Sequence, residues 1–137
     1  MNIKIINIGN KLAEKDLNNY CKELIKRINI YANVEEICFK NTRQLIEVIN
    51  KFKNVIALDI DGKQIDSYQF SKLLIKDLTF IIGPHDGFKK EEKDFLFSNY
   101  EILSLSKLTL PHRLCKILLL EQIYRGFCII HNHPYAK

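Results

Sequence analysis

Residues 78–87 read Leu78-Thr-Phe-Ile-Ile-Gly-Pro-His-Asp-Gly87, and this stretch decides the fold class. Its first five residues are almost all apolar and end at a glycine, which is typical of a strand buried on both faces. Residues 54–60 repeat the pattern as Asn-Val-Ile-Ala-Leu-Asp-Ile, and we expect that strand to close in a turn at Asp61-Gly62. Strands buried on both faces, with helices between them, predict a parallel sheet.

The rest of the chain alternates between strand-like and helix-like patterns. From Leu17 to Ile28, apolar residues recur at i, i+3, i+4, i+7, i+8 and i+11, which marks one face of an amphipathic helix. Further strands are expected over 3–8, 34–39 and 102–105. Two further helices are expected to begin at capping residues, one at Thr42 and one at Asp66 or Ser67. Two more helices are expected over 89–97 and 111–127. The sequence therefore predicts one α/β domain over residues 1–137, with a mostly parallel sheet flanked by helices.

The composition is that of a soluble globular protein. Of the 137 residues, 47% are hydrophobic and 27% are charged, which disfavours disordered, collagen-like and coiled-coil classes. The net charge of +5 favours an acidic partner, first of all a nucleic acid. No apolar run approaches the roughly 20 residues of a membrane span, and Met1-Asn-Ile-Lys4 leads straight into a strand without a signal peptide. We therefore expect a cytoplasmic protein with no membrane contact.

Cysteine and histidine show no metal-binding pattern. The four cysteines (Cys21, Cys38, Cys115 and Cys128) form no C-x-x-C pair. We expect them to be small buried hydrophobes in a reducing compartment. Neither they nor the four histidines have a recognised ligand spacing, so the sequence predicts no metal site.

Two loops are the default candidates for a binding site. Residues 83–87 and 105–112 each follow a predicted strand, and ligands of parallel sheets bind beyond the carboxyl ends of the strands. We therefore expect the two loops to be neighbours in space. The sequence Gly-Pro-His-Asp-Gly lacks the spacing of a dinucleotide site or a phosphate loop, and it is equally consistent with a plain tight turn.

The final helix is unusually apolar. Ten of the fifteen residues from Leu114 to Cys128 are apolar, and the polar positions are scattered around the helix rather than gathered on one face. These polar positions are Lys116, Glu121, Gln122 and Arg125. Either the helix lies deep in the monomer or it packs on a second subunit; for so small a domain we favour the second subunit.

The last third of the chain carries a specific resemblance. It contains Ser104-Leu-Ser-Lys-Leu-Thr-Leu-Pro-His112, Lys116-Ile-Leu-Leu-Leu-Glu-Gln-Ile-Tyr-Arg125 and Asn132-His-Pro-Tyr135. These motifs resemble the SPOUT-class methyltransferases that act on a pseudouridine of bacterial large-subunit (23S) ribosomal RNA. Weaker matches lie earlier in the chain, at 7–11, 58–63 and 80–83, and they occur in the same order as in the family. The resemblance therefore covers nearly the whole chain.

The resemblance implies a fold, a cofactor and a reaction. It implies a C-terminal trefoil knot, a homodimer, and S-adenosylmethionine as methyl donor. The product would be N3-methylpseudouridine in large-subunit ribosomal RNA, with the assembled ribosome as substrate. On this resemblance, the cofactor is held by Leu58, Gly83, Pro84, Leu105, Ser106, Lys107, Leu108, Thr109 and Leu110.

The C-terminal tail of the family takes part in catalysis and RNA contact. Tyr135 and Lys137 match that tail, which makes Tyr135 the candidate catalytic residue. Ala136 stands where the family has a histidine, and the identity of the base therefore stays open between Tyr135, His133 and His131. RNA phosphate is expected to contact Arg113, Arg125 and Lys137.

A second departure leaves an alternative function open. Pro84 replaces the second glycine of the family's Ile-Gly-Gly-x-x-Gly, and proline has no N–H to offer a ligand. With Ala136, this change allows a catalytically impaired knotted relative that acts only as an RNA- or ribosome-binding protein. A flavodoxin-like nucleotide binder is a weaker alternative, because Gly9-Asn-Lys11 after the first strand is a poor phosphate loop.

Overall fold

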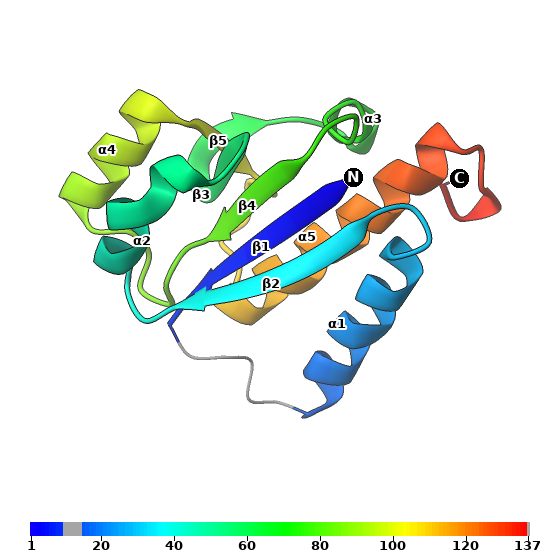
Figure 1. The fold of residues 1–137 in the computed structure, drawn as a ribbon, viewed down its shortest axis with the longest axis horizontal. Helices are drawn as coiled ribbons and strands as arrows, with labels where there is room; N and C mark the ends of the chain where they lie inside the picture. The colour runs from blue at the N-terminus through cyan, green and yellow to red at the C-terminus, as the bar shows by residue number, and fades with distance from the viewer. Residues whose placement is uncertain (10–14, 137) are drawn as a thin grey trace.

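The computed structural model describes residues 1–9 and 15–136, and this part of the chain is built on a sheet of five parallel strands (Figure 1). The strands are β1 (Asn2–Ile8), β2 (Asn33–Phe39), β3 (Val55–Gln64), β4 (Leu78–Ile82) and β5 (Glu101–Ser104). They pair in the order β2-β1-β4-β3-β5. This arrangement confirms the expected parallel α/β fold, whereas the knotted path of the C-terminal segment stays a prediction.

Helices cover both faces of the sheet. On one face lie α1 (Lys15–Ile28), α3 (Ser67–Ser71) and α5 (His112–Ile130), and on the other lie α2 (Thr42–Val48) and α4 (Lys90–Asn99) (Figure 1). Short 3₁₀ turns form at η1 (Ile49–Lys51) and at η2 (Pro134–Ala136). None of the described helices combines the length and the apolar character needed to cross a membrane.

The strand residues divide between two apolar layers. Ile3 and Ile5 of β1 pack toward α1 and α5, whereas Ile6 and Ile8 pack toward α2 and α4. All five residues of β4 are buried. The near-continuous apolar runs therefore correspond to strands that are covered on both faces, as predicted.

Side-chain caps set where two helices begin. The carboxamide of Asn41 accepts the N–H of Gln44 at 2.9 Å, so α2 begins at Thr42 and the prediction that Thr42 is the cap is wrong by one residue. Asp66 accepts the N–H of Gln69 at 2.7 Å, and the Gln69 side chain accepts the N–H of Asp66 at 3.0 Å. This capping box confirms Asp66 as the start signal of α3.

β3 continues past the expected turn at Asp61-Gly62. Leu58 and Lys63 both pair with Leu103 of β5, so the four residues between them bulge out of the strand. A Cβ on Gly62 would lie 2.7 Å from the backbone carbonyl carbon of Leu103, which is closer than such atoms approach. The expected strand end is therefore wrong, because pairing with β5 resumes after the bulge.

The cysteines are free but not all buried. Cys21 and Cys128 are buried and Cys115 is half-buried. Cys38 is exposed, and the prediction that the cysteines are buried is wrong for this residue because it lies on the edge strand β2. Within the described residues, no group of three or more His, Cys, Asp or Glu side chains is arranged to hold a metal ion.

Gly62→Ala is expected to lower the free energy of unfolding by about 1–3 kcal/mol, the usual cost of forcing extra atoms into a packed region. The new Cβ would collide with the backbone of Ile102 and Leu103, so β5 would have to move away from β3. Urea unfolding measures the effect, with Gln64→Ala on the same strand as the control. An unfolding free energy equal to that of the wild type would show that the bulge does not need glycine.

Candidate functional site

A cavity of about 310 Å³ lies where β4 and β5 end, beside the bulge of β3. Its wall contains eight of the nine residues expected to hold a cofactor: Leu58, Gly83, Pro84, Leu105, Ser106, Leu108, Thr109 and Leu110. The ninth, Lys107, is exposed and does not line the cavity. The two loops that follow β4 and β5 are therefore neighbours, as the sequence predicts for a parallel sheet.

The loop after β4 turns tightly against its own start. The N–H of Gly87 donates to the carbonyl of Pro84 at 2.9 Å, and Gly87 has a φ of +79°. A Cβ on Gly83 would lie 3.0 Å from the ring of Phe88. Because the turn uses the carbonyl of Pro84 and needs no N–H from it, proline is compatible with this loop.

Two serines shape the loop after β5. The Ser104 hydroxyl donates to the carbonyl of Ser106 at 2.9 Å, and the Ser106 hydroxyl accepts the N–H of Leu108 at 2.9 Å. Such local side-chain bonds hold an irregular backbone in one path. The serines are thus loop formers, and the apolar side chains around them form much of the cavity wall.

The first turn of α5 adds His112 and Cys115 to the cavity; His112 ends the 105–112 loop that the sequence predicts as part of the site, whereas Cys115 was not predicted. Burial lowers the pKa of His112, and the neighbouring His85 lowers it further, while hydrogen bonding to the backbone of Gly83 opposes the shift. Burial raises the pKa of Cys115. At neutral pH the cavity therefore contains a neutral His112 imidazole and a protonated Cys115 thiol.

An acidic pair flanks the cavity on the bulge of β3. Asp59 lines the cavity, and its carboxylate accepts the N–H of Asp61 at 3.0 Å. Lys93 of α4 pairs with both carboxylates, at 3.3 Å from the Asp59 Oδ2. The hydrogen bond to Asp61 raises the pKa of Lys93. This ion-pair cluster ties the bulge to α4, and it was missed because the sequence around Gly62 was interpreted as an ordinary turn.

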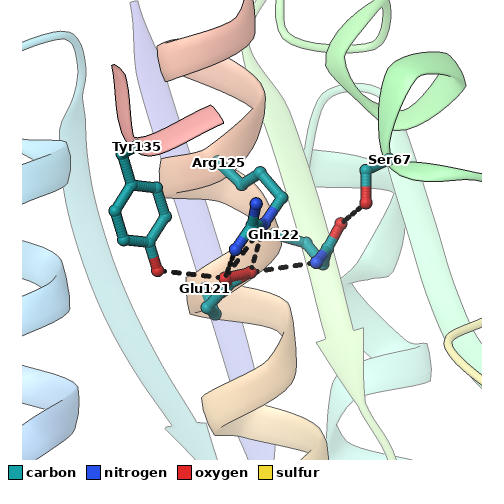
Figure 2. A network of polar contacts seen from close by, with 5 residues as sticks. All are labelled: Ser67, Glu121, Gln122, Arg125 and Tyr135. Atoms are coloured by element: carbon teal, nitrogen blue, oxygen red, sulfur yellow. Dashed lines mark hydrogen bonds and ion pairs between the residues drawn. The ribbon is translucent and has the colours of Figure 1, made fainter. Parts of the chain in front are cut away.

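Tyr135 does not line this cavity in the described protomer. Its hydroxyl donates to the Glu121 carboxylate at 3.1 Å (Figure 2). Burial and the Glu121 charge raise the pKa of Tyr135, with Arg125 opposing the shift. Held in this way, Tyr135 is a protonated phenol that donates a hydrogen bond.

The other tail and RNA candidates lie at several places. His131 stacks on Tyr31 with ring centroids 4.7 Å apart, and the Nδ1 of His133 accepts the N–H of Tyr135 at 3.1 Å. Arg113 is exposed in the first turn of α5, and Arg125 binds Glu121. Lys137 lies outside the described residues.

Lowering the pH from 7 to 5 is expected to reduce the free energy of unfolding more in the wild type than in His112→Gln. The folded-state pKa of His112 is lowered from 6.5, so the unfolded chain takes up a proton first as the pH falls. The stability associated with neutral His112 is therefore present above pH 6.5 and lost as the pH falls through the lowered pKa. Urea unfolding at both pH values tests this, and equal losses in the two proteins would contradict it.

Comparison with known proteins gives matches over the full chain. The family model described as predicted SPOUT methyltransferase matches residues 1–136. Proteins named ribosomal RNA large subunit methyltransferase H from Mesoplasma florum and Bacillus cytotoxicus are 35% and 37% identical to this chain, and each alignment covers 100% of both proteins.

Solved structures share the fold at low identity. A putative RNA methyltransferase from Bacillus anthracis superposes with a TM-score of 0.60 at 10% identity, with 96% of both chains covered. A putative methyltransferase from Legionella pneumophila, solved with bound S-adenosylmethionine, gives 0.56 at 16% identity over 90% of this chain and 65% of that chain. The full-length sequence matches confirm the resemblance carried by residues 104–135: the chain belongs to the SPOUT methyltransferase family.

Proposed function

We propose that this protein transfers a methyl group from S-adenosylmethionine to large-subunit ribosomal RNA. The observation that carries the proposal is the cavity at the ends of β4 and β5, whose wall contains eight of the nine residues at the family's cofactor positions. Relatives that match over their whole length are named as methyltransferases of that RNA. Following the family resemblance, we assign the target as N3 of a pseudouridine, and the substrate as the assembled ribosome.

The residues present fit the proposed cofactor. A volume of about 310 Å³ lies in the range of small-molecule sites, and the lining is mostly apolar with a few polar groups. Gly83 lets the Phe88 ring pack directly against the loop, since a Cβ there would lie 3.0 Å from that ring. Asp86 brings a carboxylate to the wall, which suits a ligand with a positively charged sulfonium, whereas the Asp59 carboxylate is already paired with Lys93.

Positioning is the main contribution that the cavity makes to catalysis. When bound, S-adenosylmethionine supplies an electrophilic methyl group that must lie in line with the attacking nitrogen. The leucine-rich loop 105–110 and the turn at 83–87 hold the donor and exclude water, and orientation of this kind supplies up to roughly 7–11 kcal/mol of a barrier. The target nitrogen also loses a proton, and a positioned base contributes about 10²–10⁴-fold.

We also propose a homodimer that forms through α5. Leu119, Leu120 and Ile123 of this helix are fully buried in the protomer, whereas Leu114 is 39% exposed and Ile130 is 43% exposed. A second subunit would cover the partly exposed apolar side chains. The proposal combines both interpretations of the helix, with its centre deep in the monomer and its remaining apolar surface in an interface.

Gly83→Val is expected to weaken S-adenosylmethionine binding by at least about tenfold, or ~1.4 kcal/mol. The added side chain would collide with the Phe88 ring and force the ring or the loop to move, and both line the cavity. Calorimetric titration of the folded protein measures the affinity, with Lys107→Ala as a control because Lys107 does not line the cavity. Wild-type affinity in Gly83→Val would place the donor elsewhere, and weakened binding in Lys107→Ala would extend the site beyond the cavity.

Ribosomes incubated with the protein and S-adenosylmethionine are expected to gain one methyl group on one pseudouridine of the large-subunit RNA. Mass spectrometry of nuclease digests measures the gain. Truncation after Asn132 removes Tyr135 and is expected to abolish the gain while preserving the dimer, because α5 stays complete. Donor binding without methyl transfer by the full chain would instead support the RNA-binding alternative that Ala136 and Pro84 raise.

A further inference from the structure

The C-terminal segment 131–136 folds back along α5 (Figure 1). Asn132 adopts a positive φ of 55°, and the N–H of His133 donates to the carbonyl of Cys128 at 2.8 Å. The N–H of Ala136 then donates to the carbonyl of His133 at 3.0 Å. This reversal brings Tyr135 beside residues that lie up to 14 positions earlier in the chain.

Glu121 is the point at which the tail meets the helix (Figure 2). Its carboxylate accepts the Tyr135 hydroxyl at 3.1 Å, the Arg125 Nε at 3.0 Å and the Arg125 Nη2 at 3.0 Å. The Arg125 guanidinium also lies over the Tyr135 ring, 4.9 Å from its centroid. Tyr135 is thus held by a charged acceptor at its hydroxyl and by a cation at its ring face.

The same network reaches across to α3. Gln122 Nε2 donates to Glu121 Oε1 at 2.9 Å, and the Ser67 hydroxyl donates to Gln122 Oε1 at 2.6 Å (Figure 2). Ser67 and Gln122 line a second cavity of about 310 Å³. Two of its wall residues, Ser104 and Leu105, also line the candidate cofactor cavity. Through Gln122 and Ser67, the polar network around the tail therefore extends to a cavity that shares two wall residues with the candidate cofactor cavity.

The burial of these groups makes the contacts strong. Side chains of Arg125 and Glu121 are 28% and 17% exposed, so water screens their attraction less than it would on an open surface. Tyr135 also packs on Tyr124 with ring centroids 4.6 Å apart.

We propose that Glu121 and Arg125 are positioning residues whose ion pair latches Tyr135, and with it the C-terminal segment, onto α5. The inference rests on the proposed function, in which the tail takes part in methyl transfer. It assigns Arg125 to the tail rather than to an RNA phosphate. A latched tail meets the RNA in one conformation, so less conformational entropy is lost on binding than for a free tail.

The test compares variants that break the latch with a variant that breaks another ion pair of α5. Glu121→Gln removes the carboxylate charge. Arg125→Lys keeps the positive charge but removes the bidentate hydrogen bonding to the carboxylate. Tyr135→Phe removes only the hydrogen bond from the hydroxyl. Glu36→Gln is the matched control, because it breaks the ion pair of Glu36 with Lys116 and leaves the tail contacts intact. The full-length protein is used throughout.

Two measurements are made on each protein. Carboxypeptidase trimming of the C-terminus reports whether the tail is held, and steady-state methylation of ribosomes gives kcat and the KM for S-adenosylmethionine. Glu121→Gln is expected to speed trimming at least about tenfold and to lower kcat at least about tenfold, with KM changed less than about twofold. Arg125→Lys and Tyr135→Phe are expected to fall between Glu121→Gln and the wild type, and Glu36→Gln to match the wild type in trimming and kcat.

Each other outcome overturns a defined part of the inference. Equal trimming of Glu121→Gln and wild type would show that the ion pair does not hold the tail. Faster trimming with an unchanged kcat would show that the latch is structural and positions no reacting group. If the wild type transfers no methyl group, the proposed function is overturned. If Glu121→Gln is nevertheless trimmed faster than the wild type, the inference that the ion pair holds the tail remains supported.

Discussion

Pairing of β4 with β1 on one side and β3 on the other is the interaction on which the rest of the structure depends. β4 lies at the centre of the sheet and all of its residues are buried, so both helical layers pack against it. Parallel pairing sends the loop after β4 to the same edge as the loop after β5, which is how Gly83 and Leu105 come to share one cavity. Without that alignment, the two loops have no common site.

The polar residues of α5 contact different parts of the protein from different sides of an apolar helix. Lys116 is buried and pairs with Glu36 on the edge strand β2, which ties the helix to the sheet. Glu121 and Arg125 bind the returning tail, and Gln122 binds the start of α3. The scatter of these positions around the helix reflects three different partners. An amphipathic helix with one buried face and one solvent-exposed face would instead have its polar residues on the exposed face.

Most of the fold was predictable because its signals are local. Apolar runs identified the buried strands and spacing identified α1, while the start of α3 was predicted as a cap at Asp66 or Ser67 and the structure decided for Asp66. The bulge in β3 was not predictable, since it depends on Leu58 and Lys63 pairing with the same residue of β5. The cap of α2 was placed one residue late, because Asn41 and Thr42 have similar capping preferences and burial of Thr42 decides between them.

The sequence by itself determined the α/β class, the family and the two loops of the candidate site, because strand periodicity and a long specific motif need no knowledge of tertiary contacts. Only the tertiary structure decided that Asp59 and Cys115 line the cavity beside those loops, and that Lys107, although it belongs to the second loop, does not line it. It also decided that Tyr135 lies against Glu121 and Arg125. Such contacts depend on the angle at which α5 crosses the sheet and on the reversal at Asn132, and packing of the whole chain sets that angle.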